Sequence, residues 1–148
     1  MNTATAFTVT LVLNTLWFGA GFWYFSLTPN IAAKLLVPKS ARGSPLFLTI
    51  AASVRFLGGM NLAFSAFAAL VLINSSLFPE PAQRALFAGV FSLAHASQFV
   101  ANLPVALRGG RVDESLWPVL SGPMLFIFTV DITLMVANAA LAAMLLAR

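Results

Sequence analysis

The chain of 148 residues contains no cysteine and very few charged residues. The absence of cysteine excludes disulfides, thiolate metal sites and thiol catalysis, and it leaves the redox compartment open. Charged residues make up 8% of the chain, against about 25% in soluble domains, while 60% of the residues are hydrophobic. With a mean hydropathy of +0.94, this composition predicts an integral membrane protein.

Histidine and acidic residues are also scarce. His95 is the only histidine, which excludes haem held by two histidines of one chain. A metal site stays open as an alternative, but its side chains, His95, Gln98, Asn102 and Asp131, make a poor ligand set, and we expect neither metal nor cofactor. Eight basic residues against four acidic ones give a net charge of +4. Because they are scattered, they predict positive loops at a membrane surface, not nucleic-acid binding.

Four apolar segments are long enough to cross a bilayer, which requires about 20 residues per helix. They run over residues 7–27, 47–73, 84–107 and 123–147. Thr28 and Pro29 predict the cap and first turn of a short helix on the membrane surface, which Pro38 ends. The sequence therefore predicts a single all-α domain over residues 1–148, an antiparallel bundle of four transmembrane helices.

The basic residues are distributed unequally between the loops. Five of them lie in the first and third loops: Lys34, Lys39, Arg42, Arg108 and Arg111. Only Arg84 and Arg148 lie on the other side. The positive-inside rule then predicts that loops 28–46 and 108–122 are cytoplasmic and that both termini are on the opposite side, as expected for a bacterial inner membrane.

Polar side chains interrupt the apolar segments, most clearly the third. His95, Gln98 and Asn102 are spaced i, i+3 and i+7, so they form one stripe on a helix. Lipid cannot satisfy such a stripe, which must therefore face protein or water. We expect one polar layer inside the bundle. Its other members are Asn14, Trp17, Arg55 and Asp131.

Arg55 and Asp131 are the charged members of this layer. Each lies eight residues from the cytoplasmic start of its predicted segment, or about 12 Å deep at 1.5 Å per residue. A lone charge at the centre of a membrane helix costs about 2.5–3.5 kcal/mol, which an opposite charge at the same depth offsets in part. We therefore expect an Arg55–Asp131 ion pair, supported by Gln98 and by His95 or Asn14.

Two further expectations concern helix shape. The small residues in register with Arg55, namely Ala51, Gly59 and Ala63, predict that this face of the second segment packs against a neighbouring helix. In the third segment, Pro104 has no N–H to give the carbonyl of Val100. The sequence therefore predicts a bend or an early helix end between Val100 and Pro104.

The polar layer admits several roles. An ion pair that fixes helix register is one, a pocket for a lipid, quinone or other amphipathic ligand is another, and a proton path is a third. We expect an accessory or scaffold protein that binds a membrane-protein partner or a hydrophobic small molecule. The alternative is an enzyme acting on a quinone or lipid, with Arg55 as anion holder, His95 as proton donor and Asp131 as base.

Short strings resemble two families of small four-helix membrane proteins. The segment Val54-Arg55-Phe56-Leu57-Gly58-Gly59 resembles the second helix of DoxX-like bacterial proteins. Asn14, Ser53-Val54-Arg55 and His95-Ala96-Ser97-Gln98 together resemble the ergosterol-biosynthesis scaffold family, with Gln98 where that family tends to carry an acid. Asp131 has no counterpart in either pattern. Both resemblances cover about two helices and imply an accessory or scaffolding protein.

Overall fold

The computed structural model describes residues 2–110 and 117–147, and its regular structure there is helical, without a strand. The elements are α1 (Thr3–Phe22), the π-helical turn η1 (Trp23–Leu27), α2 (Pro29–Leu36), the 3-10 turn η2 (Lys39–Ala41), α3 (Leu46–Ile73), the 3-10 turn η3 (Ser75–Leu77), α4 (Pro81–Leu107) and α5 (Gly122–Leu146). The prediction of an all-α fold is confirmed.

Four helical segments are long and apolar enough to cross a membrane. They are Thr3–Leu27, which joins α1 to η1, Leu46–Ile73, Pro81–Leu107 and Gly122–Leu146. Each begins and ends within about four residues of a segment expected from the sequence. Pro29 opens α2, as its place after Thr28 predicts. These are the properties of a multi-pass membrane protein.

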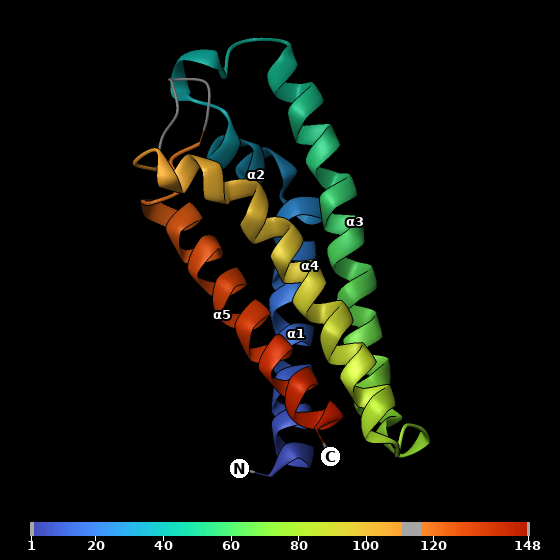
Figure 1. Cartoon of the computed structure of the whole chain (residues 1–148). Coiled ribbons are helices and arrows are strands. Elements are labelled where there is room, and N and C mark those ends of the chain that lie inside the picture. The colour runs from blue at the N-terminus through green and yellow to red at the C-terminus, as the bar shows by residue number, and fades with distance from the viewer. Residues whose placement is uncertain (1, 111–116, 148) are drawn as a thin grey trace.

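The four long helices run in alternating directions, so that both termini lie at one end of the molecule (Figure 1). We call this the terminal end, and the opposite end, which carries the connections before α3 and after α4, the loop end. Along its length α1 packs mainly on α3, and α4 packs mainly on α5. α1 touches α4 and α5 far less. The fold is therefore built from two helix pairs, α1 with α3 and α4 with α5.

A cluster of phenylalanine rings fills the terminal half of the bundle and reaches the middle of the molecule at Phe18. Stacked, tilted and edge-on contacts at centroid distances of 4.9–6.5 Å join rings from both helix pairs: Phe18, Phe64, Phe67, Phe78, Phe87 and Phe91. Phe18 and Phe91 are buried completely or almost completely. Without a hydrophobic driving force in lipid, such close packing is what holds helices together. The two pairs are thus packed tightly at the terminal end.

The close approach between α3 and η1 uses Gly58. A Cβ atom placed on Gly58 would overlap the Ser26 hydroxyl and lie 2.6 Å from the Ser26 backbone nitrogen. The predicted contact row is wrong in part, because Gly59 faces open space and Ala63 is exposed, while Ala51 is buried. One residue along a helix turns the side chain by about 100°, which separates the two faces.

Pro104 lies inside α4, which continues to Leu107, so the helix does not end early. The α4 ribbon changes direction in its last turns at the loop end (Figure 1). Asn102, two residues before the proline, also bonds the helix backbone, with Nδ2 donating to the Gln98 carbonyl at 2.9 Å. A proline that removes one backbone bond is a sufficient cause for such a bend.

Candidate functional site

A buried hydrogen-bonded network joins the two helix pairs near the middle of the molecule. His95 of α4 lies between Asp131 of α5 and Asn14 of α1, and all three are 0% exposed. Its Nδ1 lies 3.0 Å from Asp131 Oδ1, and its Nε2 lies 2.9 Å from Asn14 Oδ1. The Phe18 ring stacks on the imidazole at a centroid distance of 4.7 Å. His95 therefore connects the phenylalanine cluster to the polar network.

The orientation of Asn14 determines which imidazole nitrogen carries a proton. Asn14 Nδ2 donates to the backbone carbonyl of Thr10 at 2.8 Å and to Asn138 Oδ1 at 3.1 Å. The Thr10 carbonyl can only accept, so the amide nitrogen of Asn14 must face it. Asn14 Oδ1 then faces His95 and accepts its Nε2–H. Asn138 is oriented in the same way, because its Nδ2 donates to the Leu134 carbonyl.

With Nε2 protonated, the 3.0 Å contact between His95 Nδ1 and Asp131 Oδ1 is a hydrogen bond only when a further proton lies between these two atoms. Placed on Nδ1 it gives an imidazolium–carboxylate pair, and placed on Oδ1 it gives two neutral groups. The net charge of the pair is zero in both cases, which suits a site among apolar helices. Trp17 Nε1 also donates to Asp131 Oδ1, at 3.0 Å, while Oδ2 is buried and has no hydrogen-bonding partner among the described residues.

These bonds leave no lone pair on His95 for a metal ion. Nε2 donates to Asn14, and Nδ1 shares the remaining proton with Asp131. A metal at His95 would have to break one of these contacts. Nowhere in residues 2–110 and 117–147 do three or more acidic, histidine or cysteine residues gather as a metal site.

The predicted ion pair between Arg55 and Asp131 is wrong. Asp131 is bound by His95 and Trp17, and within the described ranges the pair with His95 is the sole salt bridge. Arg55 is exposed on α3, and its backbone carbonyl accepts a hydrogen bond from Ser26 of η1. The depth of Arg55 in the membrane was estimated from helix rise, which does not give the direction of its side chain. Val54 is the buried residue on this turn of α3, and Arg55, about 100° further round the helix, faces outward.

Gln98 and Asn102 are on the same stripe as His95 but have different neighbours. Gln98 is half-buried and lines a cavity at the loop end. Asn102 is buried, and its Oδ1 accepts a 2.7 Å hydrogen bond from Trp117 Nε1. The three residues of the stripe therefore contact three different regions. His95 belongs to the network, Gln98 lines the cavity, and Asn102 bonds the connection that leads into α5.

The cavity has a volume of about 510 Å³ and lies between the two helix pairs. One wall comes from α1 and η1 with single residues of α2 and α3, and the other from α4 and α5. Most of the lining is apolar or aromatic, while Gln98, Asn61 and Tyr24 supply polar groups. Side chains of η1 line it, and π-helical turns are frequent at functional sites. Volume and lining are typical of small-molecule sites.

Trp17 links the cavity to the buried network. Its ring lines the cavity and meets Phe126 edge-on at 5.6 Å, while its indole N–H bonds Asp131. His95 and Asp131 do not line the cavity. An occupant would thus contact the histidine–aspartate pair only through Trp17.

Sequence reasoning brought together Asn14, Trp17, His95 and Asp131, which do lie in one network. It left out Asn138, although the seven-residue spacing from Asp131 places both on one helix face. It also left out η1, for which no sequence signal was used. Arg111 and Arg148 of the loop-charge argument lie outside the described residues.

Comparison of the chain with protein-family models, with curated proteins and with solved structures found no match. The resemblances to the DoxX-like and ergosterol-biosynthesis scaffold families stay predictions.

Proposed function

We propose that this protein is a membrane accessory protein that holds an amphipathic small molecule in the cavity between its two helix pairs. The observation that carries the proposal is the cavity of about 510 Å³. Its wall includes Trp17, which donates a hydrogen bond to the buried Asp131. Its apolar lining suits a hydrocarbon or ring system, and its few polar groups suit a single orientation of the bound molecule.

The histidine–aspartate pair has a positioning role in this proposal. Its two hydrogen-bonding partners, Asn14 and Trp17, are both side chains of the bundle, and both members of the pair are fully buried. By fixing the Trp17 ring, the pair shapes the cavity without touching the ligand. The enzyme alternative required Arg55, His95 and Asp131 in one site, and Arg55 is exposed on another helix and does not bond Asp131.

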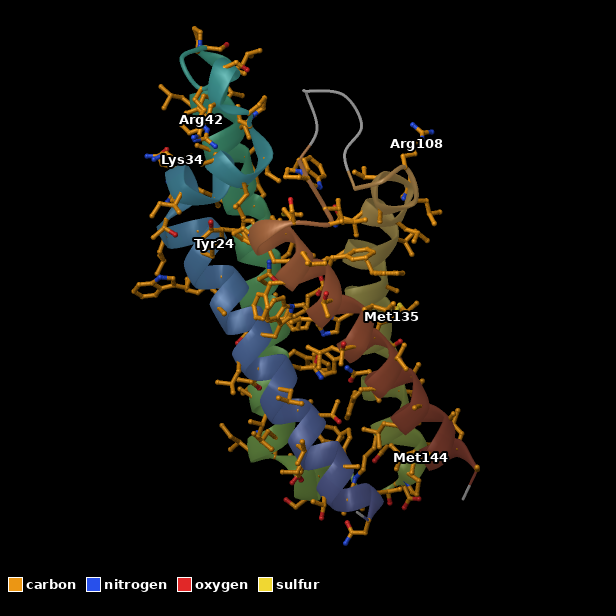
Figure 2. All side chains as sticks on the ribbon, turned by 90° about the vertical axis from the view of Figure 1, so that its left-hand side faces the viewer. Tyr24, Lys34, Arg42, Arg108, Met135 and Met144 are labelled. Atoms are coloured by element: carbon orange, nitrogen blue, oxygen red, sulfur yellow. The ribbon has the colours of Figure 1, made fainter. Side chains whose placement is uncertain are left out.

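The proposed setting is a bacterial inner membrane with loops 28–46 and 108–122 in the cytoplasm. The charge distribution supports it, since Lys34, Arg42 and Arg108 lie at the loop end (Figure 2). The native chain lacks cysteine, so single cysteines at Ser40 and Ser76 can be labelled selectively in intact cells and in inverted vesicles. We expect Ser76→Cys to react from outside and Ser40→Cys from inside. Labelling of both from one side would contradict this topology.

A test of ligand binding is to fill the cavity and ask what is lost. Ile127 lines the cavity, and Ile127→Trp reduces its volume. Ile132 lies on the same helix outside the lining, so Ile132→Trp is a matched control for the size of the added ring. Each protein is purified in mild detergent, and organic extracts are compared by mass spectrometry. We expect one class of small molecule, near one per chain, in wild type and in Ile132→Trp but not in Ile127→Trp.

Two results would overturn the ligand proposal. One is equal retention of every co-purifying molecule in the two tryptophan variants. The other is an extract with bulk membrane lipid alone together with a stoichiometric protein partner in all three samples, which would favour the scaffold role instead.

A further inference from the structure

A second cavity, of about 430 Å³, lies at the loop end and has a basic wall. Three cationic side chains, Lys34, Lys39 and Arg42, line it on the side of α2 and η2. Trp117 and the first residues of α5 line it on the other side. No carboxylate occurs among the described residues that line it. Its chemistry is therefore that of an anion site, unlike the apolar cavity below it.

The basic cavity and the apolar cavity adjoin each other. Leu35 of α2 and Pro123 of α5 line both cavities. A molecule with its chain in the apolar cavity would therefore carry its head group past these two residues into the basic one. The order from the membrane interior outward is buried network, apolar cavity, basic cavity.

Arg42 is held in place, whereas the two lysines extend into solvent. The Arg42 guanidinium donates to the carbonyls of Val37 and Lys34, at 3.1 and 2.7 Å, and the residue is half-buried. Lys34 and Lys39 are exposed, and neither meets a carboxylate at salt-bridge distance within the described ranges. The wall combines one fixed cation with two adjustable ones.

We propose that the ligand is a single-chain amphiphile with an anionic head group, its chain in the apolar cavity and its head between Lys34, Lys39 and Arg42. This rests on the proposed function and adds the ligand class. A volume of about 510 Å³ is within the range of drug-sized ligands, about 300–1,000 Å³, which accommodates one chain better than two. An anionic head group is favoured by about 1 kcal/mol per nearby basic residue, or about fivefold in affinity.

The test uses the full chain in nanodiscs of zwitterionic lipid. Three probes share one brominated alkyl chain and differ in their head, which is phosphate, hydroxyl or trimethylammonium. Bromine near Trp17 or Trp23, which both line the apolar cavity, quenches tryptophan fluorescence, so saturable quenching above that of bulk lipid reports chain binding. Inorganic phosphate alone serves as a competitor.

Lys34→Gln and Lys39→Gln each remove one cation of the basic wall. Arg108→Gln is the matched control, since Arg108 lies at the same end, across from Lys34 (Figure 2), and does not line the cavity.

We expect the phosphate probe to bind at least about tenfold more tightly than the hydroxyl probe and each lysine variant to lose about fivefold of that preference. Arg108→Gln should change it by less than about twofold, and inorganic phosphate should not displace the probe. Equal binding of all three probes, unaffected by the lysine variants, would overturn the anionic head group and leave the proposed function standing. Displacement by inorganic phosphate would identify a free-anion site instead. Absence of saturable binding by any probe would overturn both proposals.

Discussion

The two ends of this bundle are filled in opposite ways. At the terminal end, interlocking phenylalanine rings from α1, α3 and α4 leave the helix pairs in close contact. At the loop end the same two pairs separate around the apolar cavity, and α2, η2 and the start of α5 line the basic cavity that adjoins it. The buried network of Asn14, His95 and Asp131 lies between the two regions. The difference indicates that tight packing is concentrated at the terminal end, while the loop end holds the cavities in which the proposed ligand would bind.

We expect the largest loss of stability from a substitution of Asp131, which belongs to the buried network between the two ends. Its Oδ1 accepts from Trp17 and shares a proton with His95. The oxygen of an asparagine could accept from both groups only if His95 carried both of its ring protons, which would leave a buried imidazolium without a counter-charge. Breaking a buried charged pair costs about 3–5 kcal/mol in soluble proteins. We expect Asp131→Asn to lower the free energy of unfolding by about 3 kcal/mol or more, measured by denaturant titration in detergent.

Arg55 provides the control for that experiment. Because Arg55 is exposed and does not bond Asp131, Arg55→Met should leave stability almost unchanged. The double variant should then be as unstable as Asp131→Asn alone. A double variant more stable than Asp131→Asn alone would show that Arg55 and Asp131 are coupled, which would contradict the structure and support the ion pair predicted from the sequence.

A second prediction compares equal truncations at the two ends. Phe91 is 1% exposed in the phenylalanine cluster, while Phe126 is 63% exposed beside the apolar cavity. Phe91→Ala leaves a void in a packed region and should cost about 3 kcal/mol of unfolding free energy. Phe126→Ala enlarges a space that already exists and should cost well under half as much. Similar losses in thermal unfolding for the two variants would show that the ends are equally packed.

The smallest effect concerns the wall of the cavity rather than its contents. A Cβ on Gly58 has no room against Ser26, whereas a Cβ on Gly59 meets nothing within 4 Å. Gly58→Ala should push η1, which begins at Trp23, away from α3 and cost about 1–3 kcal/mol of unfolding free energy, with altered tryptophan fluorescence. Gly59→Ala should be neutral or slightly stabilising, because alanine favours helix. An equally neutral Gly58→Ala in thermal unfolding would mean that η1 and α3 are not tightly joined.

Hydropathy was sufficient to predict the helices but not their rotation. The ends of α3 and α4 agree with the sequence within a few residues, since long apolar runs bounded by proline have few alternatives. The partner of Asp131 was predicted wrongly because helix rise gives depth and not direction. Arg55 and His95 were both at suitable depth, and only the packing of α4 on α5 decides between them.

The cavities were beyond sequence reasoning for a different reason. A cavity forms where side chains from several helices do not fill the space between them. This depends on the relative positions of the helices, which the residue type at any one position does not give. η1 is the clearest case, because its five residues, Trp23–Leu27, continue the apolar run without a break. A π-helical turn has more residues than an α-helical turn, so it changes the directions in which the side chains of Tyr24 and Phe25 point. Hydropathy does not depend on these directions.

The division of hydrogen bonds between the helix pairs has a consequence for biogenesis. Within the first pair, Ser65 bonds the Thr15 carbonyl and Asn14 Nδ2 bonds the Thr10 carbonyl, so little polarity is left exposed to lipid. Within the second pair, Ser92 bonds the Met135 carbonyl and His95 meets Asp131. Each half therefore satisfies several of its polar groups without the other, which is what separate insertion of two helical hairpins into a bilayer would require. Joining the halves afterwards requires few new polar contacts, chiefly those of Asn14 with His95 and Asn138 and of Trp17 with Asp131.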